Sequence, residues 1–370
     1  MHDTTLRDGE QMPGVVFGFG EKIRMAEKIM DFGADLIDIM PAVSETEFRA
    51  TKELTRMFGN RVSATSRAKK PDIDAAINAG AERITLFSPL SDLHIAQKLK
   101  ITRDENIRNS CEMIDYARSH GIAVDFAGED ATRADMAYLK QFLKEIHGKI
   151  AMFFIADTVG CLTPESARKL VWYVRNSARC EVAIHFHNDF GMATANTVEG
   201  ILAGADCFSG TFTGIGERAG NAPIEEVCTA LHYLCGMEVN VKFNMLKEIC
   251  GTVQELSGIR LQKHKPLVGE NAFAHESGIH VDGILKNPKT YEFLNPEDVG
   301  QKRKICIGKH SGRKGIEHVL REKCGDEIAP EDAEIVLKAI KEAYERKRDS
   351  LSDEEIETIV SEIKCRRVLA

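Results

Sequence analysis

Two histidines one residue apart, His185 and His187, end a short run of β-branched and apolar residues. Side chains on a β-strand alternate between its two faces, so both imidazoles point the same way while Phe186 points to the opposite face. Two imidazoles on one face can share a metal ion, and such a site still needs a carboxylate from elsewhere in the chain. The alternative is a pair of unrelated polar residues at the end of a strand.

A repeating pattern of short apolar runs and amphipathic stretches extends from Met1 to about Leu234. Eight apolar runs are predicted strands: His2–Leu6, Leu36–Met40, Arg61–Thr65, Arg83–Phe87, Ile122–Phe126, Ile150–Ala156, Val182–His185 and Cys207–Phe212. Helical periodicity falls in Glu21–Phe32, Arg103–His120, Ala134–Ile146, Thr163–Asn176, Met192–Ala203 and Ile224–Leu234. Alternating strands and helices indicate parallel strands, and eight such units predict a closed (β/α)8 TIM barrel. An open doubly wound sheet is the alternative, but it usually has fewer strands and a glycine-rich first turn, which is absent here.

The pattern changes after Leu234. Phe243–Gly258 has helical periodicity, and charged helical periodicity returns in Pro330–Lys347 and Ser352–Lys364. We therefore predict a catalytic barrel over residues 1–258. A linker and a smaller, mainly helical C-terminal region are expected over residues 259–370.

The composition excludes several classes of protein. The net charge is −8 with a pI near 5.9, so no basic excess favours nucleic acid as a partner, and an anionic substrate has to be met by a local cluster of cations. The ten cysteines include no Cys-x-x-Cys pair, which argues against a zinc ribbon and for reduced thiols. No apolar run approaches the roughly 18 residues that span a bilayer, and no secretory leader is recognisable. We expect a cytoplasmic protein without a membrane partner.

Polar or ionisable side chains follow nearly every predicted strand of the barrel. In a TIM barrel the active site lies at the carboxyl ends of the strands, so these side chains are expected to share one site. The segments concerned are Thr4–Gln11, Gly128–Asp130, Ala156–Thr158, His185–Asp189 and Gly214–Asn221.

Asp8, after the first strand, is the predicted third metal ligand, because barrel closure brings it towards His185 and His187. Two histidines and an aspartate suit a divalent first-row ion and leave positions open for water or substrate. The same trio describes non-haem iron oxygenases. Those enzymes commonly have a double-stranded β-helix fold, which the helix content of this chain argues against.

Three motifs together carry a resemblance to a known family: Asp3–Gln11, His185–Asp189 and Gly214–Asn221. They resemble the signatures of the acyl-CoA-condensing metal-dependent TIM barrels, which include 2-isopropylmalate, homocitrate, citramalate and Re-type citrate synthases. The likeness continues through His275–Gly283 and covers roughly residues 3–315. The run Ile84–His94 is most similar to nitrogen-fixation-type homocitrate synthases.

The resemblance implies a Claisen condensation, in which the enolate of acetyl-CoA attacks the ketone of a 2-oxo acid and the thioester is then hydrolysed. Asp8, His185 and His187 would hold a divalent ion (zinc, manganese, magnesium or cobalt) that acts as a Lewis acid. Asn221 matches a further metal-associated position of the family. Arg7 would stabilise the developing alkoxide, and its alternative role is a structural ion pair with an acid at a strand end.

The family also assigns roles to residues outside the metal site. Glu129 is expected to act as an acid or to orient acetyl-CoA, while Thr158 and Gln11 bind substrate. His280 matches the catalytic base and Tyr291 the tyrosine that assists it. In the family these two residues reach the active site of the neighbouring subunit, so a homodimer with exchanged C-terminal segments is implied.

The identity of the 2-oxo acid is argued from charge. Arg67, at the end of the third strand, is the best cation for a second carboxylate, so a dicarboxylic substrate is predicted, 2-oxoglutarate as in homocitrate synthases. Oxaloacetate, the substrate of Re-type citrate synthases, and the monocarboxylic substrates of 2-isopropylmalate and citramalate synthases remain alternatives. A metal-dependent lyase of the hydroxymethylglutaryl-CoA type would share the first and seventh strand motifs but would not need His280 and Tyr291.

Overall fold

The computed structural model describes residues 1–324, 330–348 and 351–368. They form two compact units, Met1–Leu261 and Gln262–Ala370. No helix of these described residues is long and apolar enough to cross a membrane. The cysteines with described side chains form no disulfides, and the side chains of Cys324 and Cys365 lie outside that set.

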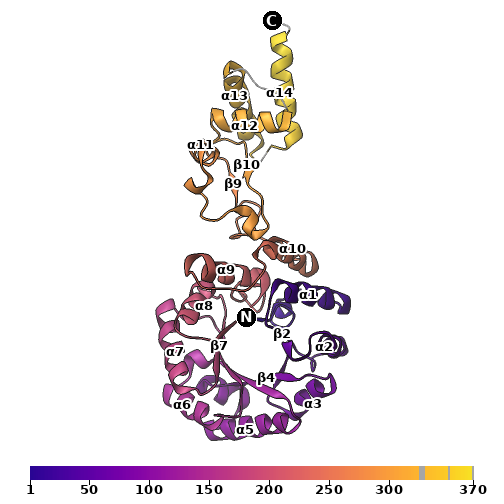
Figure 1. Cartoon of the computed structure of the whole chain (residues 1–370), viewed down its shortest axis with the longest axis vertical. Helices are drawn as coiled ribbons and strands as arrows, with labels where there is room; N and C mark the ends of the chain where they lie inside the picture. Colours follow the sequence, from indigo (N-terminus) through magenta and orange to yellow (C-terminus); the bar gives the residue numbers. More distant parts are fainter. Residues whose placement is uncertain (325–329, 349–350, 369–370) are drawn as a thin grey trace. The chain divides into compact units, whose positions relative to one another are not determined.

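The first unit is a closed barrel of eight parallel strands in sequential order, as the sequence predicts. Figure 1 shows the strands enclosed by helices. The strands are β1 (His2–Asp3), β2 (Leu36–Ile39), β3 (Val62–Arg67), β4 (Arg83–Pro89), β5 (Ala123–Glu129), β6 (Met152–Asp157), β7 (Glu181–Phe186) and β8 (Cys207–Gly210).

The helices that follow the strands cover the outside of the barrel. They are α1 (Phe19–Phe32), α2 (Glu45–Phe58), α3 (Lys70–Asn78), α4 (Asp92–His94), the π-helix η3 (Ile95–Leu99), α5 (Arg103–Ser119), α6 (Met136–Glu145), α7 (Pro164–Ser177), α8 (Ala193–Leu202), α9 (Ile224–Thr229), the π-helix η6 (Ala230–Leu234) and α10 (Leu246–Ser257). Short 3₁₀ turns are η1 (Gly9–Gln11), η2 (Gly59–Arg61), η4 (Ala131–Arg133), η5 (Phe212–Gly214) and η7 (Phe243–Met245).

Local sequence signals explain where several helices begin. Ser44 accepts a hydrogen bond from the backbone nitrogen of Glu47 and so caps α2. Thr102 and Glu105 form a reciprocal capping box at the start of α5. Such caps satisfy amide groups that have no partner inside the helix, which fixes the points where the loops at the strand ends enter the outer layer.

The first strand is shorter than predicted and ends at Asp3 rather than Leu6. The Asp3 carboxylate accepts hydrogen bonds from the backbone nitrogen and the hydroxyl of Thr5, which turns the chain away from the sheet. Two residues are nevertheless enough to close the barrel, because His2 is in register with Leu36 of β2 and with Ser209 of β8.

The core between strands and helices is apolar, whereas part of the barrel interior is polar. Phe126 and Phe153 are fully buried with parallel rings, and Phe126 also contacts Phe142 of α6. Inside the barrel, Arg83 forms a two-point ion pair with Asp125. Such hydrogen bonds hold inward-facing side chains of the strands in place, and the site is built from inward-facing side chains.

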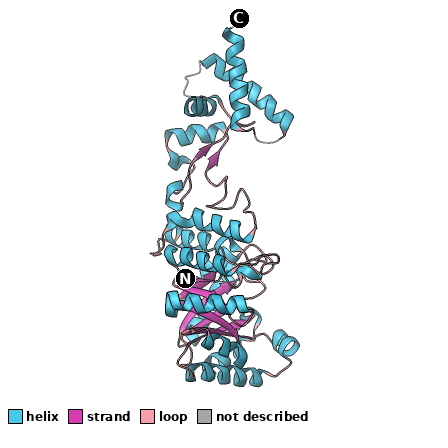
Figure 2. Ribbon diagram, turned by 90° about the vertical axis from the view of Figure 1, so that its right-hand side faces the viewer, coloured by secondary structure: helices cyan, strands magenta, loops and turns pink. Residues whose placement is uncertain are grey.

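The second unit is smaller and mainly helical, as predicted (Figure 2). A short parallel pair, β9 (Ala274–His275) and β10 (Lys304–Ile305), is accompanied by α11 (Gly278–Lys286), η8 (Pro288–Thr290), η9 (Pro296–Val299), α12 (Arg313–Cys324), α13 (Pro330–Lys347) and α14 (Asp353–Val368). Its core consists of Ile307, Ile316, Val319, Leu320, Val336, Ile340, Ile356 and Val360.

Candidate functional site

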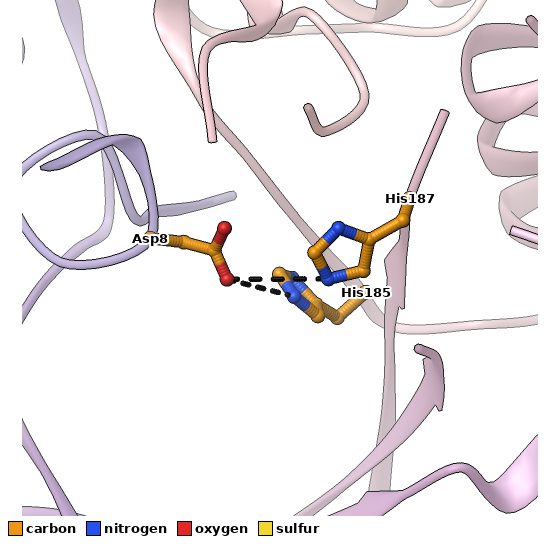
Figure 3. Close-up of side chains that lie close together, drawn as sticks. All are labelled: Asp8, His185 and His187. Atoms are coloured by element: carbon orange, nitrogen blue, oxygen red, sulfur yellow. Dashed lines mark ion pairs between the residues drawn. The ribbon is translucent and has the colours of Figure 1, made fainter. Parts of the chain in front are cut away.

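Asp8, His185 and His187 converge at the carboxyl ends of the barrel strands, and Figure 3 shows both imidazoles facing the carboxylate. The Oδ2 atom of Asp8 lies 3.5 Å from Nε2 of His185 and 4.0 Å from Nε2 of His187. Metal–ligand bonds of about 2.0–2.2 Å place neighbouring ligand atoms roughly 3–4 Å apart. The trio therefore fits a divalent ion, and all three residues are buried.

Ser209 orients the ring of His185, and burial affects the charge of His187. The Nδ1 atom of His185 lies 3.2 Å from the hydroxyl of Ser209, a contact that orients the ring. Burial, helped by the neighbouring His185, lowers the pKa of His187 to about 4. The His187 imidazole is therefore neutral at neutral pH and has a lone pair to offer.

Asp8 is kept ionised by its neighbours. Burial alone would raise the pKa of this carboxyl, but the Arg7 guanidinium, aided by His185, holds the pKa well below its usual range. Arg7 is shared between two acids: Nη1 donates to Asp8 and Nε donates to Asp38, each at 2.8 Å. The ion pair considered from the sequence is therefore present, and it lies on the cavity wall beside the trio.

Asn221 lies next to the trio through Asp8. Its Nδ2 atom donates to Oδ1 of Asp8 at 2.9 Å, and its Oδ1 atom is buried without a hydrogen-bond partner in the described structure. Gly216 allows this approach, because a Cβ atom there would overlap Nδ2 of Asn221 and lie 2.8 Å from Oδ1 of Asp8. In this orientation of its amide group, Asn221 holds the Asp8 carboxylate in place through the hydrogen bond from Nδ2.

A cavity of about 450 Å³ opens beside the trio. Gln11, Glu129 and Thr158, predicted to bind substrate or to act in catalysis, all line it. The Thr158 hydroxyl accepts a hydrogen bond from the backbone nitrogen of Asp130 at 2.8 Å, which leaves the hydroxyl proton for another partner. The remaining lining residues are His2, Arg7, Asp8, Asp38, Met40, Thr65, Thr85, Phe87, Lys98, Ala127, Phe154, Ala156, His185, His187, Ser209, Glu217 and Arg218.

Arg67 is not brought to this site. It is absent from the described cavity wall, and its guanidinium forms a two-point ion pair with Asp72 in the first turn of α3. The cation that the sequence assigned to a second substrate carboxylate is therefore engaged elsewhere.

His280 and Tyr291 belong to the second unit, where their rings stack with centroids 4.1 Å apart. His280 lies in α11, and Tyr291 directly follows η8. His275 contacts Glu292, which is also held by Arg303. The motif residues of this unit thus include one stacked pair and one separate ion-paired cluster.

Sequence reasoning missed four charged residues of the cavity wall, Asp38, Lys98, Glu217 and Arg218. Asp38 had a signal, because it is an acid inside the apolar run of β2 and is 1% exposed. Arg218 had one too, within the glycine-rich motif after β8, and it pairs with Asp189. Lys98 had none, since it lies in a π-helix whose wider turn leaves no periodic pattern in the sequence.

Comparison with known proteins gives matches along most of the chain. The HMGL-like family model matches residues 1–253, and the model described as homocitrate synthase post-HMGL domain-like matches residues 267–349. Solved structures of hydroxymethylglutaryl-CoA lyases from Brucella melitensis and Pseudomonas aeruginosa each cover 70% of this chain, with TM-scores of 0.62 and identities of 20% and 18%. They cover 99% and 93% of their own chains, and this likeness shows the barrel fold.

Relatives of higher identity span both units. A 2-isopropylmalate synthase of Sulfolobus acidocaldarius is 43% identical over 93% of this chain and 90% of its own. A homocitrate synthase of Methanothermobacter thermautotrophicus is 39% identical over 98% of this chain and 93% of its own. An Archaeoglobus fulgidus protein provisionally named (R)-citramalate synthase is 42% identical over 98% of this chain and 74% of its own. The chain belongs to the HMGL-like family, and its residues 267–349 match the homocitrate synthase post-HMGL domain-like model.

Proposed function

We propose that the protein is an acyltransferase that condenses acetyl-CoA with a 2-oxo acid and releases CoA by hydrolysis of the thioester. The observation that carries the proposal is the convergence of Asp8, His185 and His187 beside Arg7 on the wall of an open cavity. The names of relatives that align along both units support it, because these relatives are synthases.

The trio would bind a divalent ion, for which zinc, manganese, magnesium and cobalt are all chemically suitable. Such an ion supplies a Lewis acid for the ketone and carboxylate oxygens of the 2-oxo acid. Arg7 places positive charge where the ketone oxygen would become an alkoxide. The Thr158 hydroxyl would donate a hydrogen bond to the substrate carboxylate, Gln11 would contact the substrate, and Asn221 would keep Asp8 oriented.

The proton of the acetyl methyl group needs a base. We assign this role to His280 with the help of Tyr291, supplied by the neighbouring subunit of a homodimer with exchanged C-terminal segments. The stacked rings support a functional pair, because stacking fixes the imidazole plane next to a phenol. Glu129 would orient acetyl-CoA or donate a proton from the cavity wall.

The cavity lining supports a short monocarboxylic 2-oxo acid over the dicarboxylic substrate expected from Arg67. The arginines and the lysine of the wall, Arg7, Lys98 and Arg218, are already ion-paired in the described structure. Burial lowers the pKa of His2 to about 4, so this wall residue carries no charge at neutral pH. A second substrate carboxylate would therefore lose water without gaining a free cation.

The alternative of a hydroxymethylglutaryl-CoA lyase rests on the barrel alone. The matching lyase structures correspond to 70% of the chain and show only the fold. The match of residues 267–349 to the post-HMGL domain of homocitrate synthases favours the synthase.

A thiol assay tests the proposal. Purified protein with acetyl-CoA is given pyruvate, 2-oxobutanoate, 3-methyl-2-oxobutanoate, oxaloacetate or 2-oxoglutarate, and free CoA is measured. We expect one of the three monocarboxylic acids to have the highest kcat/KM. A dicarboxylic winner would overturn the specificity and keep the reaction class, while no CoA release with any acid would refute the synthase.

A further inference from the structure

Two side chains beyond the roles assigned so far, His94 and Lys98, hold the Glu129 carboxylate. The Nζ atom of Lys98 lies 2.8 Å from each Glu129 oxygen, and Nδ1 of His94 lies 3.1 Å from Oε1. Glu129 and Lys98 both line the cavity, and the Glu129 side chain is 17% exposed. The only carboxylate predicted to act on substrate from β5 is thus fixed at both oxygens.

The segment after β4 is built to bring these two residues together. Ser91 caps the turn by accepting a hydrogen bond from the backbone nitrogen of His94. The chain then widens into the π-helix η3, which ends at Lys100 in the left-handed conformation with φ 57°. His94 and Lys98 are four residues apart and face the same side.

The backbone fixes this segment against the strand that carries Glu129. Pro89 of β4 is in register with Glu129, and the backbone nitrogen of Leu90 donates to the Glu129 carbonyl at 2.8 Å. Single π-turns inside helical segments are uncommon and occur frequently at functional sites. The pairing of β4 with β5 fixes the main chain of Glu129, and the contacts with His94 and Lys98 fix its side chain.

A purely structural role does not account for the contacts of Lys98 with Glu129. The Lys98 side chain is 52% exposed, and ion pairs of exposed lysines contribute little to stability. What the contacts do fix is the direction of the carboxylate, because an unrestrained glutamate has several rotamers. A charge-assisted hydrogen bond to each oxygen selects one of them.

We propose that His94 and Lys98 are positioning residues that hold the Glu129 carboxylate towards the reacting acyl group. This inference rests on the proposed condensing function. Loss of Lys98 should lower kcat rather than substrate binding, because Lys98 acts through Glu129.

The test compares Lys98→Met with Lys98→Arg and with a matched control, Lys149→Met. Lys149 pairs with Asp115 at 2.6 Å outside the described cavity wall. We expect Lys98→Met to lower kcat by about 10- to 100-fold with KM for the 2-oxo acid changed less than about threefold. Lys98→Arg should recover part of the rate, and Lys149→Met should have wild-type kinetics. The Tm and the metal content should be unchanged in all three variants.

Two further measurements separate positioning from folding. Methylammonium should partly restore kcat of Lys98→Ala, because the half-exposed position admits a small cation. When Glu129→Gln is already present, adding Lys98→Met should lower kcat by less than about a further twofold, since the two residues act as a unit. His94→Gln should show the same dependence on Glu129.

Wild-type kcat in Lys98→Met, or a full additional loss in the Glu129→Gln background, would overturn the positioning role while leaving the condensing function intact. A lower Tm of Lys98→Met, together with no recovery of kcat of Lys98→Ala by methylammonium, would assign Lys98 a structural role instead. Wild-type protein that releases no CoA with any 2-oxo acid would refute the proposed function and this inference with it.

Discussion

The Asp3 carboxyl in β1 is 0% exposed, and Thr5 donates hydrogen bonds to both of its oxygens. Burial raises the pKa of Asp3 from its ordinary 3.8 to about 7, because the hydrogen bonds from Thr5 only partly offset the loss of water. Asp3, the first residue of the Asp3–Gln11 motif, therefore makes the stability of the barrel depend on pH.

Stability should fall as pH rises from about 4 to about 7 because of Asp3. In this range the unfolded chain has lost the proton that the folded barrel keeps, so the folded state binds more protons. The group contributes at most about 1.4 kcal/mol per pH unit. Asp3→Asn keeps the shape and removes the titration, so urea unfolding at pH 5, 6 and 7 should favour the variant increasingly over wild type. A constant difference between the two proteins would contradict the shift.

Residues differ in how far the sequence could predict their roles. Asp8 and the histidines were predictable because strand alternation and barrel closure are general rules. The engagement of Arg67 was not, because its partner Asp72 lies in a helix with no clear apolar stripe. The missing information is side-chain pairing, which depends on local geometry rather than on pattern.

At the scale of elements, the eight strands were predicted within a few residues because buried parallel strands are continuous apolar runs. Helix α2 was not among the predicted helices, although Ala50, Thr51, Leu54 and Thr55 form a buried face along it. The early end of β1 and the π-turn of η3 had no periodic signal. Irregular elements at the site were thus the least predictable from the sequence.

The loop after β8 supplies a prediction at this scale. Gly216→Ala should weaken metal binding by at least about tenfold, since the added methyl group would displace Asn221 and Asp8. Gly236→Ala is the matched control: its φ is also positive, at +67°, but nothing lies within 4 Å of the added atom. The control should lose about 1 kcal/mol of stability from backbone strain and keep its metal affinity. Equal metal affinities in the two variants, measured by calorimetry, would argue against the loop packing.

At the scale of the whole molecule, the family match joins a barrel to a domain that follows it. The sequence predicted the presence of both parts from their periodicities and assigned the role of His280 only through the motif resemblance. The stacking of His280 on Tyr291 could not be predicted from these periodicities, because it is a contact between side chains.

The proposed exchange of C-terminal segments predicts complementation between two inactive variants. Asp8→Asn and His280→Ala proteins are each expected to be inactive, and after subunit exchange at equal amounts about a quarter of wild-type activity should return. Half of the dimers would then be mixed, and one of their two sites would combine an intact barrel with an intact His280. Mixing that restores no activity, with subunit exchange confirmed by mass spectrometry, would contradict the exchange.

The central claim is that Asp8, His185 and His187 hold a metal ion needed for CoA release. It is tested most directly by measuring metal content and CoA release together, for wild type and Asp8→Asn, before and after chelator dialysis and re-addition of zinc, manganese, magnesium or cobalt. We predict that wild type loses its activity with its metal and regains it with at least one ion, while Asp8→Asn retains neither metal nor activity. Full CoA release by metal-free wild-type protein would contradict the account.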